Sequence, residues 1–217
     1  MVVNCVACTR MLVLLFVFGW QCVSASKASE LQDAVKAGDV GRVQAALSAG
    51  ADINETDIYQ GTPLHMAARI NGTAVATLLI ERGMKVDVRD SKGRTPLMIA
   101  AISGKTEVAE LLLRTGADPL AEEPTFYDTP LYVAAMNGHL DFVKMMLSRG
   151  VSVNFQNTHT GETPLWVAAM DGQMEVMEFL LSNGADPNIA SSNGMTPMSI
   201  SSDNRVKDLL RKFGAKE

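Results

Sequence analysis

The residues best suited to metal binding or nucleophilic chemistry are few in this chain and stand apart. All three cysteines lie within the first 22 residues, at Cys5, Cys8 and Cys22. None of the three histidines has a second histidine or a cysteine at the short spacing that zinc sites use. They are His65, His139 and His159. The sequence therefore predicts no metal site and no bound cofactor.

Pairs of carboxylates occur, but not where they favour acid–base catalysis. Glu107 and Glu110 are three residues apart in a helical pattern, and so are Glu175 and Glu178. Two carboxylates on one helix face point to solvent together instead of facing each other across a cleft. The sequence also has no Gly-x-Ser-x-Gly elbow, phosphate-binding glycine loop or EF-hand loop. We therefore expect the protein not to be an enzyme, and we interpret these pairs as solubilising.

The charge balance argues against nucleic acid as the ligand. The chain has 19 Lys and Arg against 24 Asp and Glu, a net charge of −5. Binding to phosphates needs a basic stripe or patch, and no run of Lys and Arg is dense enough to form one. We expect a protein partner instead.

The first 25 residues have the composition of a secretory signal. Arg10 precedes an unbroken apolar run over 11–20, and residues 23–25 (VSA) supply the small side chains that signal peptidase reads. A run of this length is too short to span a bilayer, which takes about 20 residues. We expect cleavage after Ala25 and an exported mature chain, periplasmic or secreted, without membrane contact. The alternative is an uncleaved anchor, which would make the protein a membrane-tethered scaffold.

Two other features bear on an exported chain. Removal of residues 1–25 takes away every cysteine, so no thiol is left to mispair in an oxidising compartment. Asn54 and Asn71 each begin an Asn-x-Thr glycosylation sequon. Their use depends on a eukaryotic secretory route.

One tetrapeptide sets the organisation of the chain. Thr-Pro-Leu-x recurs with steps of 33, 34, 34 and 33 residues between its threonines, and the last copy has Met in place of Leu. The threonines are Thr62, Thr95, Thr129, Thr163 and Thr196. A period in this range is typical of stacked units, each too small to bury its apolar face alone. We therefore expect a single elongated domain over 26–217.

Within one repeat the residue types predict two short helices. Thr95 is suited to cap a helix, and Pro96 fits the first helical position, where its missing N–H costs nothing. Gly104 ends this helix, because glycine adopts the left-handed conformation without strain. A second helix is expected from about 107 to 114. In an earlier copy Asn71 stands in place of Gly104, and Asn is the next best residue for a left-handed turn.

Degenerate copies at both ends are predicted to cap the stack. The first lacks the tetrapeptide, and the last is shorter and carries serines and basic residues on its outer face. Polar terminal units of this kind close a repeat array. The assigned boundaries are 29–54 for the N-terminal cap, 59–90, 91–123, 124–157 and 158–190 for four full repeats, and 191–217 for the C-terminal cap.

These motifs closely resemble the ankyrin repeat, over about 29–216. Gly138-His139 and residues 184–188 (GADPN) reproduce its characteristic turns. The resemblance implies an all-α repeat solenoid of stacked helix-turn-helix units with short β-hairpin or turn connections. It also implies a non-enzymatic role in protein–protein recognition, as an adaptor or inhibitor. His65 stands at the family's usual histidine position, and His139 follows the glycine of its turn. The resemblance implies that both imidazoles bond to turn backbone.

The resemblance places partner contacts at the hairpin tips and just after the Ala-Ala pair of each first helix. Aromatic and methionine side chains gather there, and both are common at interfaces. The predicted contact residues are Tyr59, Arg69, Ile70, Ile102, Phe126, Tyr127, Met136 and Met170. For the aromatic residues of the tips, the alternative is packing between neighbouring loops. Neither the identity of the partner nor the oligomeric state follows from the sequence.

Three large side chains that follow Thr-Pro-Leu can also be interpreted in two ways. Met98, Tyr132 and Trp166 either face the partner or pack between repeats.

The role of a small acidic run around the start of the third full repeat is open between two interpretations. Glu122, Glu123 and Asp128 either steer a basic partner or form a solvated turn.

Overall fold

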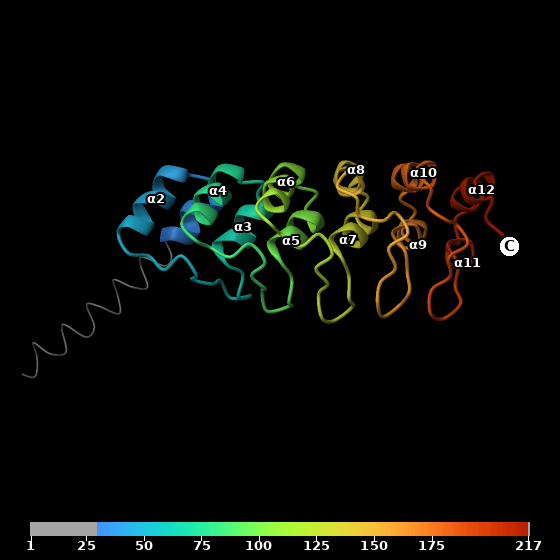
Figure 1. Cartoon of the computed structure of the whole chain (residues 1–217), viewed down its shortest axis with the longest axis horizontal. Coiled ribbons are helices and arrows are strands. Elements are labelled where there is room, and N and C mark those ends of the chain that lie inside the picture. The colour runs from blue at the N-terminus through green and yellow to red at the C-terminus, as the bar shows by residue number, and fades with distance from the viewer. Residues whose placement is uncertain (1–29, 217) are drawn as a thin grey trace, which may run out of the picture.

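The computed structural model describes residues 30–216, which form a row of helix pairs (Figure 1). The predicted signal over 1–25, its cleavage site after Ala25 and the anchor alternative all lie outside the described residues. Within 30–216, no helix is both long and apolar enough to cross a membrane.

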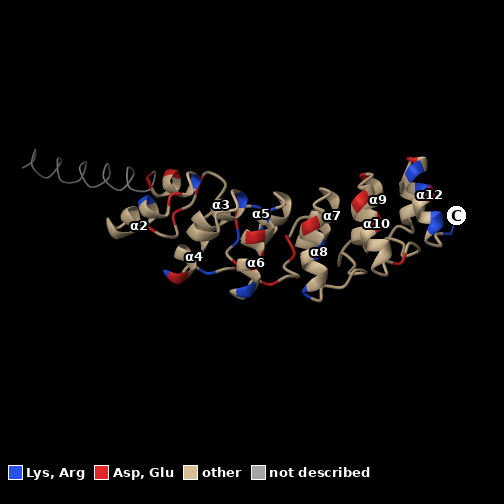
Figure 2. Ribbon diagram, turned by 90° about the horizontal axis from the view of Figure 1, so that it is seen from above, with Lys and Arg blue, Asp and Glu red and all other residues tan. Residues whose placement is uncertain are grey.

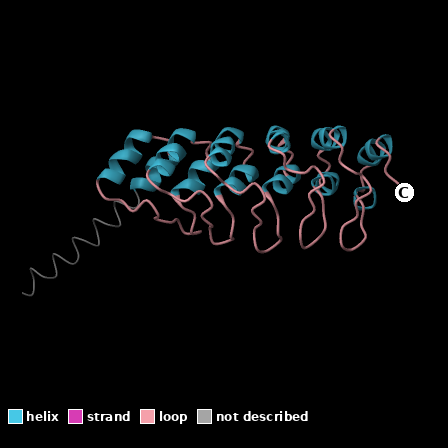
Figure 3. Cartoon of the chain, viewed as in Figure 1, coloured by secondary structure: helices cyan, strands magenta, loops and turns pink. Residues whose placement is uncertain are grey.

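The helices alternate between a short first type and a longer second type. The first helices are α3 (Pro63–Arg69), α5 (Pro96–Ile102), α7 (Pro130–Met136), α9 (Pro164–Met170) and α11 (Pro197–Ile200). The second helices are α2 (Val40–Ser48), α4 (Thr73–Glu81), α6 (Thr106–Arg114), α8 (Leu140–Ser148), α10 (Met174–Ser182) and α12 (Asn204–Lys212). Residues 30–36 are helical as well. First helices contact first helices and second contact second, which gives two layers (Figure 3).

The first helices begin as the sequence predicts. Pro96 is the first residue of α5, and the Thr95 hydroxyl accepts a hydrogen bond from the Met98 amide at 3.3 Å. The same cap opens α7 and α9. Asn71, in the position that other copies give to glycine, has φ +61°, so the expected left-handed turn is confirmed there.

The core runs without interruption between the two layers. The leucine of each tetrapeptide is buried, as is the Ala-Ala pair that follows it in α3, α5, α7 and α9. Burying one such leucine stabilises the fold by about 2 kcal/mol. Alanine at the paired positions keeps the helices of neighbouring repeats close. The predicted all-α stack with one shared interior is therefore confirmed.

Of the expected β-hairpin or turn connections, the hairpins are wrong: residues 30–216 contain no strand (Figure 3). The two arms of the loop before α5 share the bond from the Asp90 amide to the Arg94 carbonyl, 3.0 Å long. The Asp90 carboxylate binds the amides of Lys92 and Arg94, both at 2.9 Å. Such local side-chain bonds compete with a strand ladder, so each loop closes as a turn.

Neighbouring loops are also tied to one another. The Ser91 amide donates to the Tyr59 carbonyl at 3.0 Å, and the Ser192 amide donates to the Thr160 carbonyl at 2.7 Å. The loops therefore form a row along one side of the helices, as Figure 1 shows.

Candidate partner-binding surface

The large apolar side chains that are exposed within residues 30–216 are confined to one part of the fold. We name it the loop face: the C-terminal ends of α3, α5, α7 and α9 together with the loops between repeats. Large apolar residues that stand exposed are Ile58, Tyr59, Ile70, Ile102, Leu120, Phe126, Tyr127 and Met170. None lies on a second helix, where charged residues are prominent instead (Figure 2).

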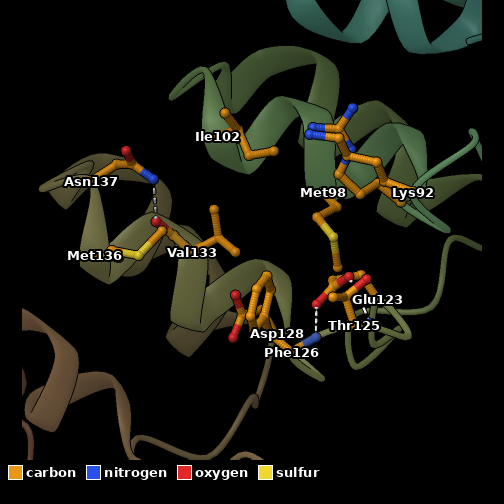
Figure 4. Close-up of a pocket in the computed structure, with 11 residues that line it drawn as sticks. Lys92, Met98, Ile102, Glu123, Thr125, Phe126, Asp128, Val133, Met136 and Asn137 are labelled. Atoms are coloured by element: carbon orange, nitrogen blue, oxygen red, sulfur yellow. Dashed lines mark hydrogen bonds between the residues drawn. The ribbon is translucent and has the colours of Figure 1, made fainter. Parts of the chain in front are cut away.

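One hollow on the loop face lies between α5 and α7, and we name it the central hollow. Its volume is about 500 Å³. Ile102, Phe126 and Met136, three of the predicted contact residues, line it together. Figure 4 shows their side chains around the open space, with Val133 between them and Met98 on the side of Lys92. The structure thus brings together residues from two helices and one loop.

A smaller hollow of about 150 Å³ lies next to it, between α3 and α5. Tyr59 and Arg69 line it, and Ile102 borders both this hollow and the central one. Five of the eight predicted contact residues therefore lie on one continuous stretch of surface.

A third hollow has a volume of about 480 Å³. The neighbours Phe126 and Tyr127 line different hollows. Tyr127 lines this third hollow with Leu120, whereas Phe126 lines the central hollow. The Tyr127 ring also stacks on His159, with ring centroids 5.0 Å apart. Adjacent aromatic residues of one loop thus serve different parts of the surface.

Two predicted contact residues lie apart from all three hollows. Ile70 points toward the turn at Gly38, where a Cβ would come within 3.9 Å of its Cδ1 atom. Met170 is exposed at the end of α9.

Two exposed residues escaped the sequence prediction, although the sequence carries a signal for one of them. Ile58 is 88% exposed beside Tyr59. Leu120 stands where other copies have Asn or Asp, such as Asp87 and Asn154. The side chains of Asp87 and Asn154 accept amide hydrogen bonds from the next repeat, which a leucine cannot do. That break in the pattern marks position 120.

The large side chains that follow Thr-Pro-Leu pack between repeats, which was one of their two interpretations. Met98, Tyr132 and Trp166 are 1%, 8% and 5% exposed. Tyr132 donates its hydroxyl proton to Glu162 at 2.6 Å, and Trp166 donates from Nε1 to the Met195 carbonyl at 2.9 Å. Burial and the nearby Glu162 charge raise the pKa of Tyr132. Tyr132 and Trp166 thus position the loop of the next repeat, whereas Met98 packs in the interior.

Both predicted histidine roles are confirmed. His65 Nδ1 accepts from the Thr62 amide at 3.1 Å, so its Nε2 carries the proton that is donated to the Arg94 carbonyl at 2.9 Å. Burial lowers the pKa of His65, which fits this neutral form. His139 Nε2 lies 3.1 Å from the Ile102 carbonyl.

Both readings of the acidic run fail at Glu123. Its side chain is buried, and its carboxylate binds the amides of Thr125 and Phe126. Glu123 therefore shapes the loop that presents Phe126. Asp128 lines the central hollow, and burial together with the charges of Glu123 and Glu162 raises its pKa to about 6.

The Asn71 sequon coincides with a structural contact. Asn71 Nδ2 donates to Glu107 at 2.7 Å, and Oδ1 accepts from the Val108 amide at 3.1 Å. A glycan on Nδ2 would disrupt this link between repeats. Asn54, in contrast, is exposed.

Comparisons with known proteins agree with this architecture. The family model described as "Ankyrin repeats (3 copies)" matches residues 31–123 and 131–215. Among solved structures, the human ASB11 ankyrin repeat domain matches with a TM-score of 0.75 and 26% sequence identity, over 86% of this chain and 84% of that one. A comparison with curated proteins gives no match.

Proposed function

The chain belongs to the ankyrin-repeat family, and on that premise we propose that it is an exported adaptor or inhibitor that holds a partner protein on its loop face. Ankyrin repeats are in general protein–protein interaction modules of a typically non-enzymatic family. Its partner would contact the central hollow and the loops beside it.

The segregation of exposed apolar side chains carries this proposal. Every large exposed apolar residue in 30–216 lies on the loop face, and none lies on a second helix. None of these side chains is needed to fill the core. Apolar patches of this kind on a soluble domain mark interaction sites.

Paired changes at Phe126 and Tyr127 test the proposal. Tyr127 has φ +61°, so Tyr127→Gly relieves backbone strain while it removes the ring, whereas alanine would keep the strain. We expect Phe126→Ala with Tyr127→Gly to weaken partner capture at least tenfold, as loss of interface hot spots does. The melting temperature should not fall, because the strain relieved at residue 127 offsets the lost stacking on His159. Capture is measured by pull-down from the exported fraction with the purified chain as bait.

A matched control changes two exposed residues of the second layer. Glu110→Ala with Glu178→Ala alters α6 and α10 and should leave capture at the wild-type level. Equal capture by the loop variant and wild type would reject the loop face as the binding surface.

Export is a separate part of the proposal and has its own test. The apolar run over 11–20 and the small residues at 23–25 support cleavage after Ala25. N-terminal sequencing of the mature protein should begin at Ser26, in the periplasmic or secreted fraction. An intact mass that retains residues 1–25 in the membrane fraction would favour the tethered scaffold instead.

A further inference from the structure

Three carboxylates lie in or close to the α7 side of the central hollow. Glu123, Asp128 and Glu162 lie close enough for the other two to raise the pKa of Asp128. None of the three forms an ion pair in the part of the chain that the structure describes. The α7 side of the hollow therefore carries negative charge without a counterion from the protein.

Glu123 and Asp128 both line the hollow, but the Glu123 carboxylate is already bound to the amides of Thr125 and Phe126, which leaves Asp128 as the carboxylate open to a ligand. Its Oδ1 atom accepts one long hydrogen bond, 3.3 Å, from Asn157 Nδ2. Its Oδ2 atom has no donor within 30–216. In Figure 4 the Asp128 carboxylate lies beside the Phe126 ring and below Val133, on the edge of the open space. A cation placed there would find an available oxygen next to apolar surface.

The opposite wall carries basic residues, but half of their charge is already compensated. Arg94 donates from Nη2 and Nε to Asp90 Oδ2, at 2.6 and 2.9 Å. Burial alone would raise the pKa of Asp90, but the bonds from Arg94 outweigh it and lower that pKa. Lys92 is exposed on its loop and lies across the hollow from Asp128 (Figure 4). The uncompensated charge at the α7 side thus remains negative.

We propose that the central hollow receives an arginine or lysine side chain from a basic segment of the partner protein. The aliphatic stem of that side chain lies on Val133 and Met136, and its cationic head meets Asp128. Long basic side chains bury their methylene groups on apolar surface in this way and keep the charge at a polar edge. A charge-assisted hydrogen bond to Asp128 fixes the orientation. This inference rests on the proposed function, because it specifies what the loop face binds.

Short capped peptides test the inference on the full chain labelled with ¹³C at methionine methyl groups. The probes are Leu-Arg-Leu, the same peptide with citrulline, which has the shape of arginine without its charge, and Leu-Glu-Leu. We expect Leu-Arg-Leu to shift the Met136 methyl signal saturably and to leave buried Met177 unchanged. Citrulline should bind about fivefold more weakly, because it lacks the charge-assisted bond.

Variants and pH identify the carboxylate. Asp128→Asn should weaken Leu-Arg-Leu about fivefold and bring it level with the citrulline peptide. Asp118→Asn, a change at an exposed carboxylate of the same inter-repeat segment, is the matched control and should have no effect. Lowering the pH from 7.5 to 5 should weaken the arginine peptide in wild type, because Asp128 becomes protonated, but not in Asp128→Asn. Lys92, Arg94, Glu123 and Glu162 are the other charged groups near this site.

Three results would overturn the inference: equal binding of the arginine and citrulline peptides, stronger binding of Leu-Glu-Leu, or no shift at Met136. The wild-type comparison decides the matter even if Asp128→Asn fails to fold. Loss of partner capture in the loop variant without any peptide response would reject only the basic-segment inference. Peptide binding with partner capture unaffected by the loop variant would reject the proposed function instead.

Discussion

Gly93 provides the sharpest test of how the loops are held together. It has φ +74°, and a Cβ at this position would lie 2.2 Å from Pro124 Cδ and 2.6 Å from Cγ of the neighbouring loop. A proline ring cannot rotate away as a flexible side chain can. Gly194 holds the equivalent place before α11, with φ +81° and nothing within 4 Å of a Cβ. The two glycines thus share a backbone conformation and differ in one contact.

Gly93→Ala and Gly194→Ala should therefore differ in stability. Both variants bear the cost of a non-glycine residue at positive φ, about 1 kcal/mol. Only Gly93→Ala also forces Pro124 to move, and overpacking of that kind costs about 1–3 kcal/mol. We expect Gly93→Ala to unfold with a free energy about 2 kcal/mol below that of Gly194→Ala, and with a melting temperature about 6 °C lower. Urea and thermal denaturation measure both quantities.

Equal stability of these two variants would refute the argument, because it would mean that the loops slide past each other freely. Partner capture gives a second readout. Pro124 lies two residues before Phe126, so its displacement should weaken capture by Gly93→Ala and spare capture by Gly194→Ala.

Three other changes probe different parts of the fold. Gly138→Val should cost more than 1 kcal/mol in urea denaturation, because a β-branched residue adopts φ +73° poorly and would displace the Gln173 side chain; stability equal to wild type would contradict the left-handed turn. Burial, and to a smaller extent repulsion from Asp52, raise the pKa of Glu55 from 4.5 to about 7. The folded protein therefore loses stability as the pH rises from about 4.5 to 7, because Glu55 ionises more easily in the unfolded chain. Glu55→Gln should then be more stable than wild type by about 1 kcal/mol above pH 7, after allowance for solvent screening, and equal to it below about pH 4.5; parallel stability curves would disprove this. Tyr132→Phe should destabilise by about 1 kcal/mol, because the half-buried hydrogen bond to Glu162 is lost, and a neutral effect in thermal melts would argue against that bond.

Much of the fold could be predicted because its signals are local. Threonine and proline at a helix start, or asparagine at a left-handed turn, act through neighbouring backbone atoms, and α5 and Asn71 behave accordingly. The strands could not be excluded in the same way. Their absence depends on how Asp90 and Glu123 each bind amides of their own loop, which follows from loop geometry rather than from residue type. The assigned repeat boundaries stay predictions.

The candidate surface was only partly visible in the sequence. Repeat position alone marks Ile102 and Met136 as contact residues, but nothing in the sequence says that they share one hollow with Phe126. The separation of Phe126 from Tyr127 was equally hidden, because it depends on the backbone angle at Tyr127. The sequence leaves Asp128 either in a patch that steers a basic partner or in a solvated turn, and its place on the hollow depends on how the loop folds back onto α7.

In each loop between repeats, one residue has a left-handed backbone conformation, and its type correlates with exposed apolar side chains in that loop. Two residues before the tetrapeptide threonine, three of the five loops have glycine at φ between +69° and +81°. The other two have Gln60 and Tyr127 at φ +57° and +61°, a conformation that costs about 1 kcal/mol without glycine. These two loops are also the ones with exposed apolar residues, Tyr59 in one and Phe126 in the other, whereas the three glycine loops have none of that size. Strain that the fold does not require thus occurs where the surface is most apolar, which is the combination expected of a binding site and not of a connecting turn.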